Sequence, residues 1–261
     1  MQKICILLFF LVEVSPLVSV SYVKCLSEKI ANTKTGEIAM KLQSDFYNEA
    51  HEKMIEEVEA TISNTASYTG ITRLSLKILK ALEQVPRHLF VLPGDENYAY
   101  LNAPLSIGEG QTISQPFIVA LMTELLDLQP EDNVLEIGTG SGYQAAILSQ
   151  LAQKVYTIEV VDSLAQAAQK KLNKLGYGNI HVLKGDGRQG WAAHAPYNKI
   201  IVTAASENVP PKLLEQLSSN GTIVIPLGKP KDEQFLTLIY KDKEGNITQR
   251  TILSVRFVPF T

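Results

Sequence analysis

The segment from Val134 to Tyr143 restricts the possible fold of this chain more than any other. It reads VLEIGTGSGY, so four residues typical of a buried strand run directly into three glycines at alternate positions. Residues 143–151 then have a helical composition, which predicts the order strand, tight turn and helix. The glycines leave out the Cβ atoms that would keep a ligand away, and the helix directs its free N–H groups toward the turn. The segment therefore predicts a nucleotide-binding junction.

The spacing of the glycines, GxGxG, bears on which nucleotide binds. A dinucleotide fingerprint requires a further glycine or alanine where this chain has Tyr143, so the spacing favours S-adenosylmethionine over NAD. A tight turn without a ligand is the third reading. Glu159 supports a ligand, because it closes the next predicted strand about 20 residues after the turn, where a carboxylate can accept hydrogen bonds from both ribose hydroxyls of an adenosine. The alternative for Glu159 is a solvated acid at a strand end.

Two further acids are candidates for binding the ligand. Glu136 lies inside the first strand, and a buried acid without a partner is costly, so we expect it to meet a donor from the ligand or from a neighbouring helix N-terminus. Asp186 lies between Gly185 and Gly187 at the end of the third predicted strand. Ligands of open α/β sheets lie beyond the carboxyl ends of strands, so Asp186 is placed to accept a hydrogen bond from an adenine amino group. A simple turn is the alternative.

Strands and helices alternate through the rest of the chain, which predicts an α/β fold with a parallel sheet and helices on both faces. Near the C-terminus, residues 235–240 and 251–255 predict a closing antiparallel hairpin. Two amphipathic helices, 45–62 and 72–85, precede the first strand, and residues 87–113 are rich in loops. The other predicted strands are residues 155–158, 180–183, 199–202 and 221–227, and the other predicted helices are residues 115–128, 163–175 and 211–217.

The N-terminal residues have the pattern of a secretory signal peptide. Lys3 precedes an apolar run over residues 4–12, and small residues follow at Ser19 and Ser21. We predict a signal peptide over residues 1–21 and a periplasmic or secreted protein. An uncleaved anchor, an ordinary buried helix and a cytoplasmic location are the alternatives.

The segment after the predicted signal peptide, residues 22–44, is mixed and polar without a sustained period. It predicts a linker, which leaves residues 45–261 as the main domain. Cys25 would be the only cysteine after cleavage, so we expect no internal disulfide. The net charge of -3 and the isoelectric point near 5.9 disfavour nucleic acid and anionic membranes as partners.

The sequence shows no obvious metal site or catalytic base. The four histidines are scattered and the two cysteines cannot form a cluster, so we expect no metal and a structural or exposed role for each histidine. Methyl transfer from a sulfonium to a carboxylate needs no base, because a carboxyl group of pKa about 4 is already ionised at neutral pH. A dry pocket that aligns the two charged groups would favour the transition state, in which both charges are being lost.

Motifs along the chain resemble the protein-L-isoaspartate (D-aspartate) O-methyltransferase family. The resemblance runs in order from about residue 45 to residue 259, and the TISQP and VRFVP motifs within it are the most specific. In chain order the motifs are GQTISQP at 110–116, VLEIGTGSGY at 134–143, GDG at 185–187 with Gly190-Trp191 after it, APY at 195–197 leading to VTAA at 202–205, and VRFVP at 255–259.

The resemblance implies a monomeric repair enzyme with a Rossmann-like methyltransferase fold, a seven-stranded sheet and residues 45–261 as the catalytic domain. Enzymes of this family use S-adenosylmethionine to methylate the α-carboxylate of L-isoaspartyl residues, with D-aspartyl residues as a further expected substrate. The ester then collapses to a succinimide that can reopen as normal aspartate. The implied partners are isoaspartyl-containing proteins and peptides, without nucleic acid or a stable membrane partner.

Site residues follow from the resemblance by position. Ser114 would lie beside the substrate carboxylate and the transferring methyl group as the catalytic residue. Physical chemistry agrees, since a hydroxyl and the N–H groups of a helix's first turn form a carboxylate site; an N-cap role alone is the alternative. Residues 255–259 would lie along the substrate backbone. The other implied substrate-binding residues are Thr112, Ile113 and Val258, and the implied donor-binding residues are Glu136, Gly138 and Gly140 on the methionine side, Glu159 at the ribose, and Asp186 and Gly187 at the adenine.

A fold does not determine the acceptor, so two rival functions stay open. One is a methyltransferase of the same fold that acts on another carboxylate or on a small molecule. The other is a protein that binds the donor without turnover.

Overall fold

The computed structural model describes residues 34–229 and 232–260. The chain divides into two compact units, residues 1–49 and 50–261, which are described separately. The predicted signal peptide, residues 1–21, and Cys25 lie outside the described residues. Among the helices of the described part, none is long and apolar enough to cross a membrane.

Helix α3 (Lys34–Asn64) begins in the first unit, inside the segment that was predicted to be a linker. No helix was predicted for residues 34–44, and the linker assignment itself stays a prediction. Met40, Lys41 and Leu42 are strong helix formers, and intrinsic propensity favours a helix even where the apolar residues form no single stripe. The exposed apolar side chains of this part of the helix are Ile38, Met40, Leu42 and Phe46.

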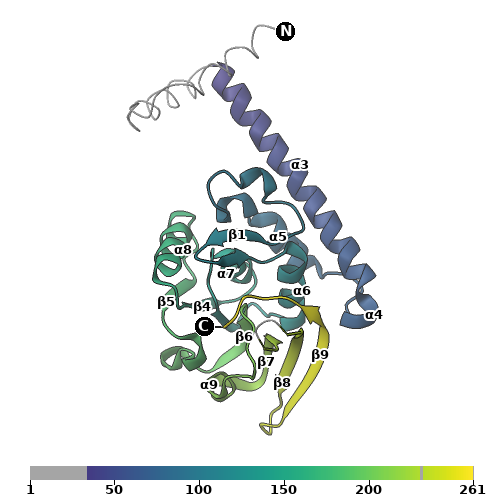
Figure 1. The fold of residues 1–261 in the computed structure, drawn as a ribbon, viewed down its shortest axis with the longest axis vertical. Coiled ribbons are helices and arrows are strands. Elements are labelled where there is room, and N and C mark those ends of the chain that lie inside the picture. The colour runs from purple at the N-terminus through teal and green to yellow at the C-terminus, as the bar shows by residue number, and fades with distance from the viewer. Residues whose placement is uncertain (1–33, 230–231, 261) are drawn as a thin grey trace. The chain divides into compact units, whose positions relative to one another are not determined.

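The second unit is built on a seven-stranded sheet with the strand order β5-β4-β3-β6-β7-β8-β9 (Figure 1). The first five strands in this order run parallel, and β8 runs antiparallel to both of its neighbours. The mostly parallel sheet with a closing antiparallel hairpin is confirmed. The strands are β3 (Asn133–Ile137), β4 (Lys154–Glu159), β5 (Ile180–Lys184), β6 (Tyr197–Val202), β7 (Leu217–Leu227), β8 (Gln234–Lys241) and β9 (Ile247–Val255).

Helices connect the parallel strands of the second unit, and further helices precede the sheet, as predicted. After α3 they are α4 (Ala66–Thr69), α5 (Leu76–Gln84), α6 (Pro116–Leu126), α7 (Tyr143–Ser149), α8 (Asp162–Lys174) and α9 (Pro211–Gln216), with the short 3-10 helices η1 (Arg87–Phe90), η2 (Glu96–Tyr98), η3 (Gly187–Gln189) and η4 (Ala192–His194).

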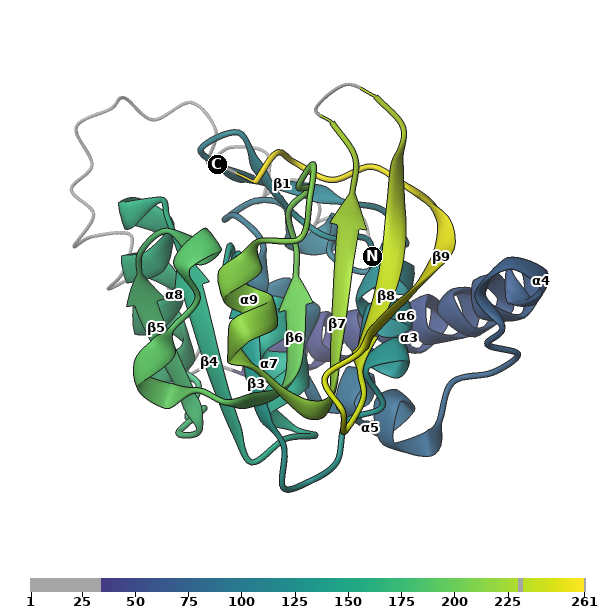
Figure 2. The ribbon, with the colours of Figure 1, turned by 90° about the horizontal axis from the view of Figure 1, so that it is seen from below.

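Helices lie on both faces of the sheet. Figure 2 shows α9 in front of the strands, with α6 and α7 behind them. Successive side chains of a strand point to opposite faces. Leu135 and Ile137 therefore share one apolar layer with Leu213 of α9, and Glu136 between them points to the other face. The sheet is covered on both sides, which explains why its central strands are almost entirely buried.

Helix α5 begins at Leu76, four residues later than the predicted start at Thr72. The N–H and the hydroxyl of Ser75 both donate to Oε2 of Glu124 in α6, at 2.8 and 2.9 Å. A tertiary contact therefore accompanies the start of the helix, and the local sequence pattern does not reveal it.

The segment 87–113, predicted to be rich in loops, contains a small hairpin formed by β1 (Leu105–Gly108) and β2 (Gln111–Ile113). The hairpin leads directly into Ser114 and the start of α6. Its turn contains three consecutive residues with positive φ, which are Gly108 (86°), Glu109 (53°) and Gly110 (70°).

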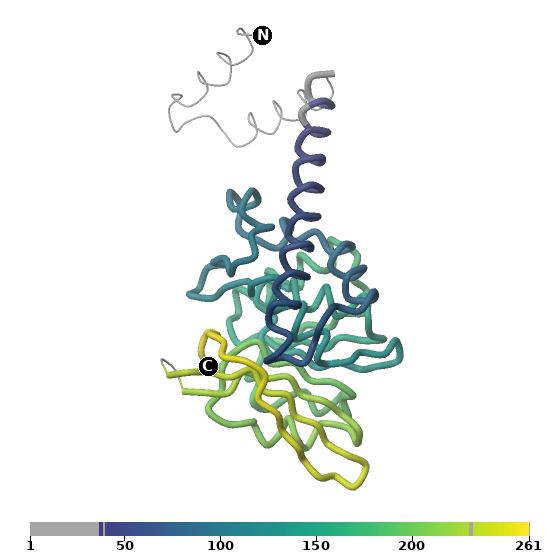
Figure 3. The backbone as a smooth tube through the Cα atoms, turned by 90° about the vertical axis from the view of Figure 1, so that its right-hand side faces the viewer, coloured from purple at the N-terminus to yellow at the C-terminus, as the bar shows by residue number. Residues whose placement is uncertain are grey.

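The sheet has a topological switch point at β3. Its successor β4 lies on one side and β6 lies on the other, and ligands of open α/β sheets bind beyond the carboxyl ends of strands at such a point. Figure 3 shows β8 and β9, in yellow, at one end of the second unit. After β9 the chain runs back across the carboxyl edge of the sheet, where Pro259 pairs with Ala205 beyond the end of β6 (Figures 1 and 2).

Candidate functional site

The turn between β3 and α7 has the backbone shape for which glycine is suited. Gly138, Gly140 and Gly142 have φ of 96°, 51° and 87°, all in the left-handed region. A Cβ at Gly138 would also collide with Oγ1 of Thr203, just after β6. This hydroxyl donates hydrogen bonds to the carbonyl oxygens of Ile137 (3.0 Å) and Gly138 (2.8 Å). Thr203 thus holds the turn from the neighbouring strand.

Glu159, at the end of β4, is only 6% exposed, so the alternative of a solvated acid is wrong. Its Oε2 accepts the N–H of Gly140 at 2.8 Å, and its Oε1 accepts the N–H of Val161 at 3.0 Å. A carboxylate oxygen has two lone pairs, so each oxygen can accept one more hydrogen bond. The carboxylate is therefore held in place and still able to bind a pair of hydroxyl groups.

A cavity of about 60 Å³ opens beside the glycine turn, and we name it the turn cavity. Four of the six residues predicted to bind the donor line it: Gly138, Gly140, Glu159 and Gly187. The structure therefore brings together the turn after β3, the acid after β4 and the glycine after β5. These three segments meet at the switch point of the sheet, as the topology requires.

Gly187 lines the turn cavity, whereas its neighbour Asp186 makes its contacts elsewhere. Gly187 is buried, and a Cβ at this position would collide with Ile137, so only glycine fits beside the cavity. Asp186 accepts hydrogen bonds from the backbone N–H and Nε of Arg188, both at 2.9 Å, and these contacts hold its pKa below the usual value. Asp186 is not among the described residues that line the turn cavity. Its predicted contact with adenine stays a prediction.

Glu136 is fully buried, but it is not among the described residues that line the turn cavity. Neither of its carboxylate oxygens has a hydrogen-bond partner within residues 34–229 and 232–260. The expected donor from a neighbouring helix is therefore not found there. Burial raises the pKa of Glu136 from 4.5 to about 8; the charge of Glu159 acts in the same direction, and the nearby Thr157 hydroxyl opposes it. Contact of Glu136 with the ligand stays a prediction.

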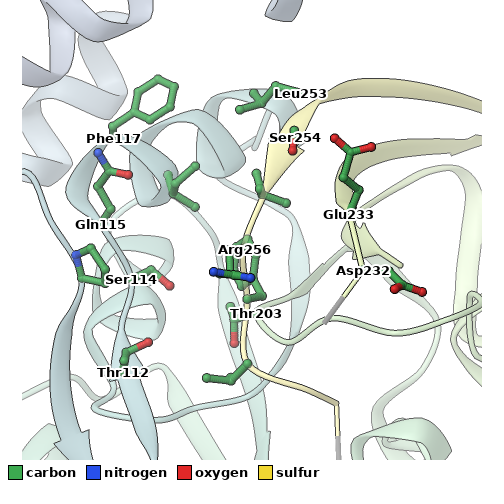
Figure 4. Close-up of a pocket in the computed structure, with 15 residues that line it drawn as sticks. Thr112, Ser114, Gln115, Phe117, Thr203, Asp232, Glu233, Leu253, Ser254 and Arg256 are labelled. Atoms are coloured by element: carbon green, nitrogen blue, oxygen red, sulfur yellow. The ribbon is translucent and has the colours of Figure 1, made fainter. Parts of the chain in front are cut away.

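A second cavity, which we name the groove, has a volume of about 650 Å³. The start of α6, the residues before β8 and the chain around the end of β9 bound it (Figure 4). Thr112 and Ser114 line the groove, whereas Ile113 between them is 4% exposed and is absent from its described lining. Successive residues of an extended chain point in opposite directions, so the Ile113 side chain points away from the groove, and its predicted role in substrate binding stays a prediction.

Ser114 is not the cap of the helix that follows it. The N-cap of α6 is Gln115, whose side chain makes no capping hydrogen bond, and the N–H of Phe117 in the first turn donates to Oδ1 of Asn102 at 3.0 Å. The alternative of an N-cap role alone is therefore wrong. Figure 4 shows the Ser114 hydroxyl and the Arg256 guanidinium extending into the groove from opposite walls, with Asp232 and Glu233 on the far side of Arg256.

The turn cavity and the groove adjoin each other. Thr112, Thr203 and Val258 line both of them. A ligand in the turn cavity and a ligand in the groove can therefore meet at these three residues. Of the three, Thr112 and Val258 were predicted to bind substrate, and Thr203 was not assigned a role.

Tyr143, the residue that replaces the further glycine of a dinucleotide fingerprint, is fully buried at the start of α7. The guanidinium of Arg87 lies over its ring at 4.9 Å from the centroid, and the Nε of Arg87 donates to the carbonyl oxygen of Ala99 at 2.8 Å. Burial raises the pKa of Tyr143 to about 12, so the phenol stays neutral. Tyr143 thus fills a packing position under the turn.

The histidines take structural or exposed positions, as expected. The ring of His51 is hydrogen-bonded to the carbonyl oxygen of Leu82 at 2.8 Å, and burial lowers its pKa. His181 and His194 are exposed and stack on the ring of Tyr156, with centroids at 5.1 and 4.3 Å. None of the four is among the described residues that line the turn cavity or the groove.

Comparison with known proteins places the chain among close relatives. A family model described as Protein-L-isoaspartate(D-aspartate) O-methyltransferase (PCMT) matches residues 56–261. The chain is 48% identical over 217 residues to a protein-L-isoaspartate O-methyltransferase 2 of Syntrophobacter fumaroxidans, covering 83% of this chain and 88% of that protein. It is 49% identical over 208 residues to the enzyme of the same name from a Polaromonas species, covering 80% and 99%.

Solved structures show the same fold. A protein-L-isoaspartate O-methyltransferase superposes with a TM-score of 0.70 at 28% identity, and the match covers 80% of this chain and 65% of that one. A Plasmodium falciparum protein assigned to the same activity, solved in complex with S-adenosyl-L-homocysteine, has a TM-score of 0.66 at 21% identity, with coverage of 81% and 98%. The second likeness is one of fold alone.

Proposed function

This chain belongs to the protein-L-isoaspartate(D-aspartate) O-methyltransferase family, and we propose that its turn cavity and groove carry out methyl transfer from S-adenosylmethionine to an isoaspartyl carboxylate. The observation that carries this assignment is the shared wall of the two cavities, formed by Thr112, Thr203 and Val258. A donor on one side and a charged acceptor on the other would meet there. The family membership supplies the identity of both groups.

The residues of the turn cavity suit the donor. Gly138 and Gly140 leave the turn open to close approach, and Glu159 has lone pairs free for the two ribose hydroxyls. When bound, S-adenosylmethionine supplies an electrophilic methyl group on a sulfonium. The cavity is smaller than the roughly 300–1,000 Å³ of most ligand sites, so we expect a wall to move when the donor binds. The β1–β2 hairpin, with its turn of glycines at 108 and 110, is that wall.

The residues of the groove suit a peptide acceptor. Ser114 is placed to donate a hydrogen bond to the α-carboxylate, and Arg256 to attract it from the opposite wall (Figure 4). A carboxyl group with a pKa of about 4 is ionised at neutral pH, so the chain needs no residue that removes a proton. Ser114, Arg256 and the shared wall would hold the carboxylate in line with the methyl group, and this alignment supplies the rate enhancement.

A pair of peptides tests the proposal. One carries L-isoaspartate and the other normal aspartate in the same sequence, and each is incubated with the full chain and methyl-labelled S-adenosylmethionine. We expect label in the isoaspartyl peptide alone. Equal labelling of both would support a methyltransferase of different specificity. Tight donor binding by calorimetry with no labelled methanol from either peptide would support the rival function, a binding protein without turnover.

We also propose that the protein acts as an exported monomer. The support for export is the signal-like sequence at residues 3–21, and the support for a monomer is the resemblance to the family. N-terminal sequencing of protein from the native host checks the first point: a mature chain that starts near residue 22 is expected, and an intact Met1 contradicts it. Light scattering of the purified protein checks the second, since a mass near twice the 28.8 kDa of the chain contradicts a monomer.

A further inference from the structure

The turn cavity has one wall whose role the family assignment leaves open. Val258, Pro259 and Phe260 line the cavity from the C-terminal segment. Val258 belongs to the wall shared with the groove, but Pro259 and Phe260 do not line the groove among its described residues. They line instead a neighbouring cavity of about 560 Å³, which we name the outer cavity. Phe260 therefore lies in the partition between the turn cavity and the outer cavity.

The backbone of this partition is fixed to the sheet. The N–H of Ala205 donates to the carbonyl oxygen of Val258, and the N–H of Phe260 donates to the carbonyl oxygen of Ala205, both at 2.8 Å. Pro259 and Ala205 form a parallel bridge beyond the end of β6. Two hydrogen bonds on either side of Pro259 thus set the direction in which the Phe260 side chain leaves the chain.

The ring of Phe260 meets the part of the turn cavity where Gly187 lies. A Cβ at Gly187 would come within 3.3 Å of Cε2 and Cζ of the ring, so the missing side chain of Gly187 is what allows the approach. The ring also packs against the apolar layer that contains Ile137, Ile158 and Leu213. The ring is therefore held in place by its backbone and by its contacts with this layer.

We infer that Phe260 binds the donor directly, as the aromatic wall against which its adenine ring packs. This inference rests on the proposed donor site. The ribose acid Glu159 and the glycine after β5, Gly187, place the adenine end of the cavity beside this ring. An adenine is a flat π system, and an aromatic side chain is the type that contributes most to its binding by stacking. Ribose and the methionine part have no comparable need for an aromatic ring.

The test is calorimetric titration of the full chain with S-adenosyl-L-homocysteine, which carries the adenine and needs no turnover. Phe260→Ala is expected to raise the dissociation constant about tenfold, within the range that alanine substitution gives for a stacked base. Phe260→Leu keeps apolar packing against the sheet and loses the aromatic face, so a smaller rise of about threefold is expected. Phe235→Ala is the matched control, because Phe235 lies on β8, is 37% exposed and is not among the described residues of these cavities.

Kinetics separate binding from a structural role. The KM for the donor should rise in Phe260→Ala, while the KM for an isoaspartyl peptide and kcat at saturating donor stay within twofold of the wild type. The inference is overturned if Phe260→Ala and Phe260→Leu bind S-adenosyl-L-homocysteine as tightly as the wild type while Glu159→Ala does not. If the wild-type protein does not bind it at all, the proposed donor site fails, and the inference fails with it.

Discussion

The turn cavity and the groove differ in the residues that line them and in their size. Among the described residues, the turn cavity is lined by three glycines and by mostly apolar side chains, and its one charged group, Glu159, is buried and held by two backbone N–H groups. The groove is about ten times larger, and its charged groups, Arg256, Asp232 and Glu233, are exposed. This difference agrees with the proposed function, in which the turn cavity binds one small molecule and the groove binds segments of different proteins. Substitutions in the first should change donor affinity, and those in the second should change the handling of peptide.

The largest effect is expected at Glu159. Glu159→Ala removes the proposed acceptor of two ribose hydroxyls and leaves the N–H of Gly140 without its partner. Hydrogen bonds to charged groups contribute about 1.5–3 kcal/mol each, so the dissociation constant of S-adenosyl-L-homocysteine should rise about 100-fold or more. Glu159→Gln keeps one acceptor oxygen, so its dissociation constant should lie between those of the wild type and Glu159→Ala. Calorimetry checks both variants, and an unchanged constant in Glu159→Ala would show that the ribose lies elsewhere.

Ser114→Ala should lower turnover rather than donor affinity. The proposed hydrogen bond from Ser114 aligns the substrate carboxylate with the methyl group, so its loss should lower kcat about 30-fold. Donor affinity should not change. Ser114→Thr keeps a hydroxyl and should recover part of the activity. Steady-state kinetics with an isoaspartyl peptide provide the measurement, and a variant with normal kcat but weakened donor binding would move Ser114 to the donor side.

The buried acid beside the turn gives a prediction about stability. Burial raises the pKa of Glu136 to about 8, whereas the unfolded chain releases this proton near 4.5. Between these values the folded state holds one more proton, so the free energy of unfolding falls as pH rises, by up to ~1.4 kcal/mol per pH unit. This contribution is fully present below 4.5 and is lost by about pH 8. Glu136→Gln cannot ionise.

Urea unfolding at pH 5, 6 and 7 of the wild type and of Glu136→Gln measures this difference. The wild type should lose stability relative to the variant by up to about tenfold in the unfolding constant for each pH unit. Parallel pH profiles would show that Glu136 is ionised in the folded protein. The same variant in the donor titration tests the predicted contact of Glu136 with the methionine side.

A moderate effect is expected at Arg256 in the groove. Arg256→Gln should raise the KM for an isoaspartyl peptide about fivefold at low salt, because an exposed cation attracts a carboxylate only weakly. The effect should shrink above about 0.15 M salt, where screening is strong. Arg256→Lys keeps the charge and should stay near the wild type. Kinetics at two salt concentrations check this, and a loss of kcat without any change in KM would contradict it.

The smallest effect is expected at the hairpin over the turn cavity. Ser163, at the start of α8, donates a hydrogen bond to Oε1 of Glu109 in the hairpin turn at 2.8 Å. Both side chains are exposed, so Ser163→Ala should raise the dissociation rate of S-adenosyl-L-homocysteine only about threefold. Glu109→Gln in the same background should add nothing further. Stopped-flow displacement measures the rate. Additive effects of the two substitutions would show that the hydrogen bond between Ser163 and Glu109 does not slow the release of the ligand.

The turn cavity could largely be predicted from the sequence, since its parts are local. The glycine turn, Glu159 and Gly187 each follow a predicted strand, and the parallel order of the strands brings them together. Family membership, predicted from five motifs, is confirmed by the family match and by relatives at 48–49% identity. The first part of helix α3, residues 34–44, was missed, because its apolar side chains Ile38, Met40 and Leu42 are exposed and form no single stripe.

The groove could be predicted only in part. Thr203 lies 65 residues from Gly138 and acts on it only because β6 pairs with β3. Ile113 is buried as part of the β1–β2 hairpin. This hairpin was not predicted, because the composition of residues 87–113 indicated loops. Phe260 reaches Gly187 through the pairing of Ala205 with Pro259, a contact of the chain end that no local pattern encodes.

The most direct test of the account is a crystal structure of the protein with S-adenosyl-L-homocysteine and an isoaspartyl peptide. We predict that the ribose lies on Glu159, that the sulfur lies beside Thr112, Thr203 and Val258, and that the peptide carboxylate meets the Ser114 hydroxyl. S-adenosyl-L-homocysteine bound away from Gly138 and Glu159, or a peptide whose carboxylate lies outside the groove, would contradict the account.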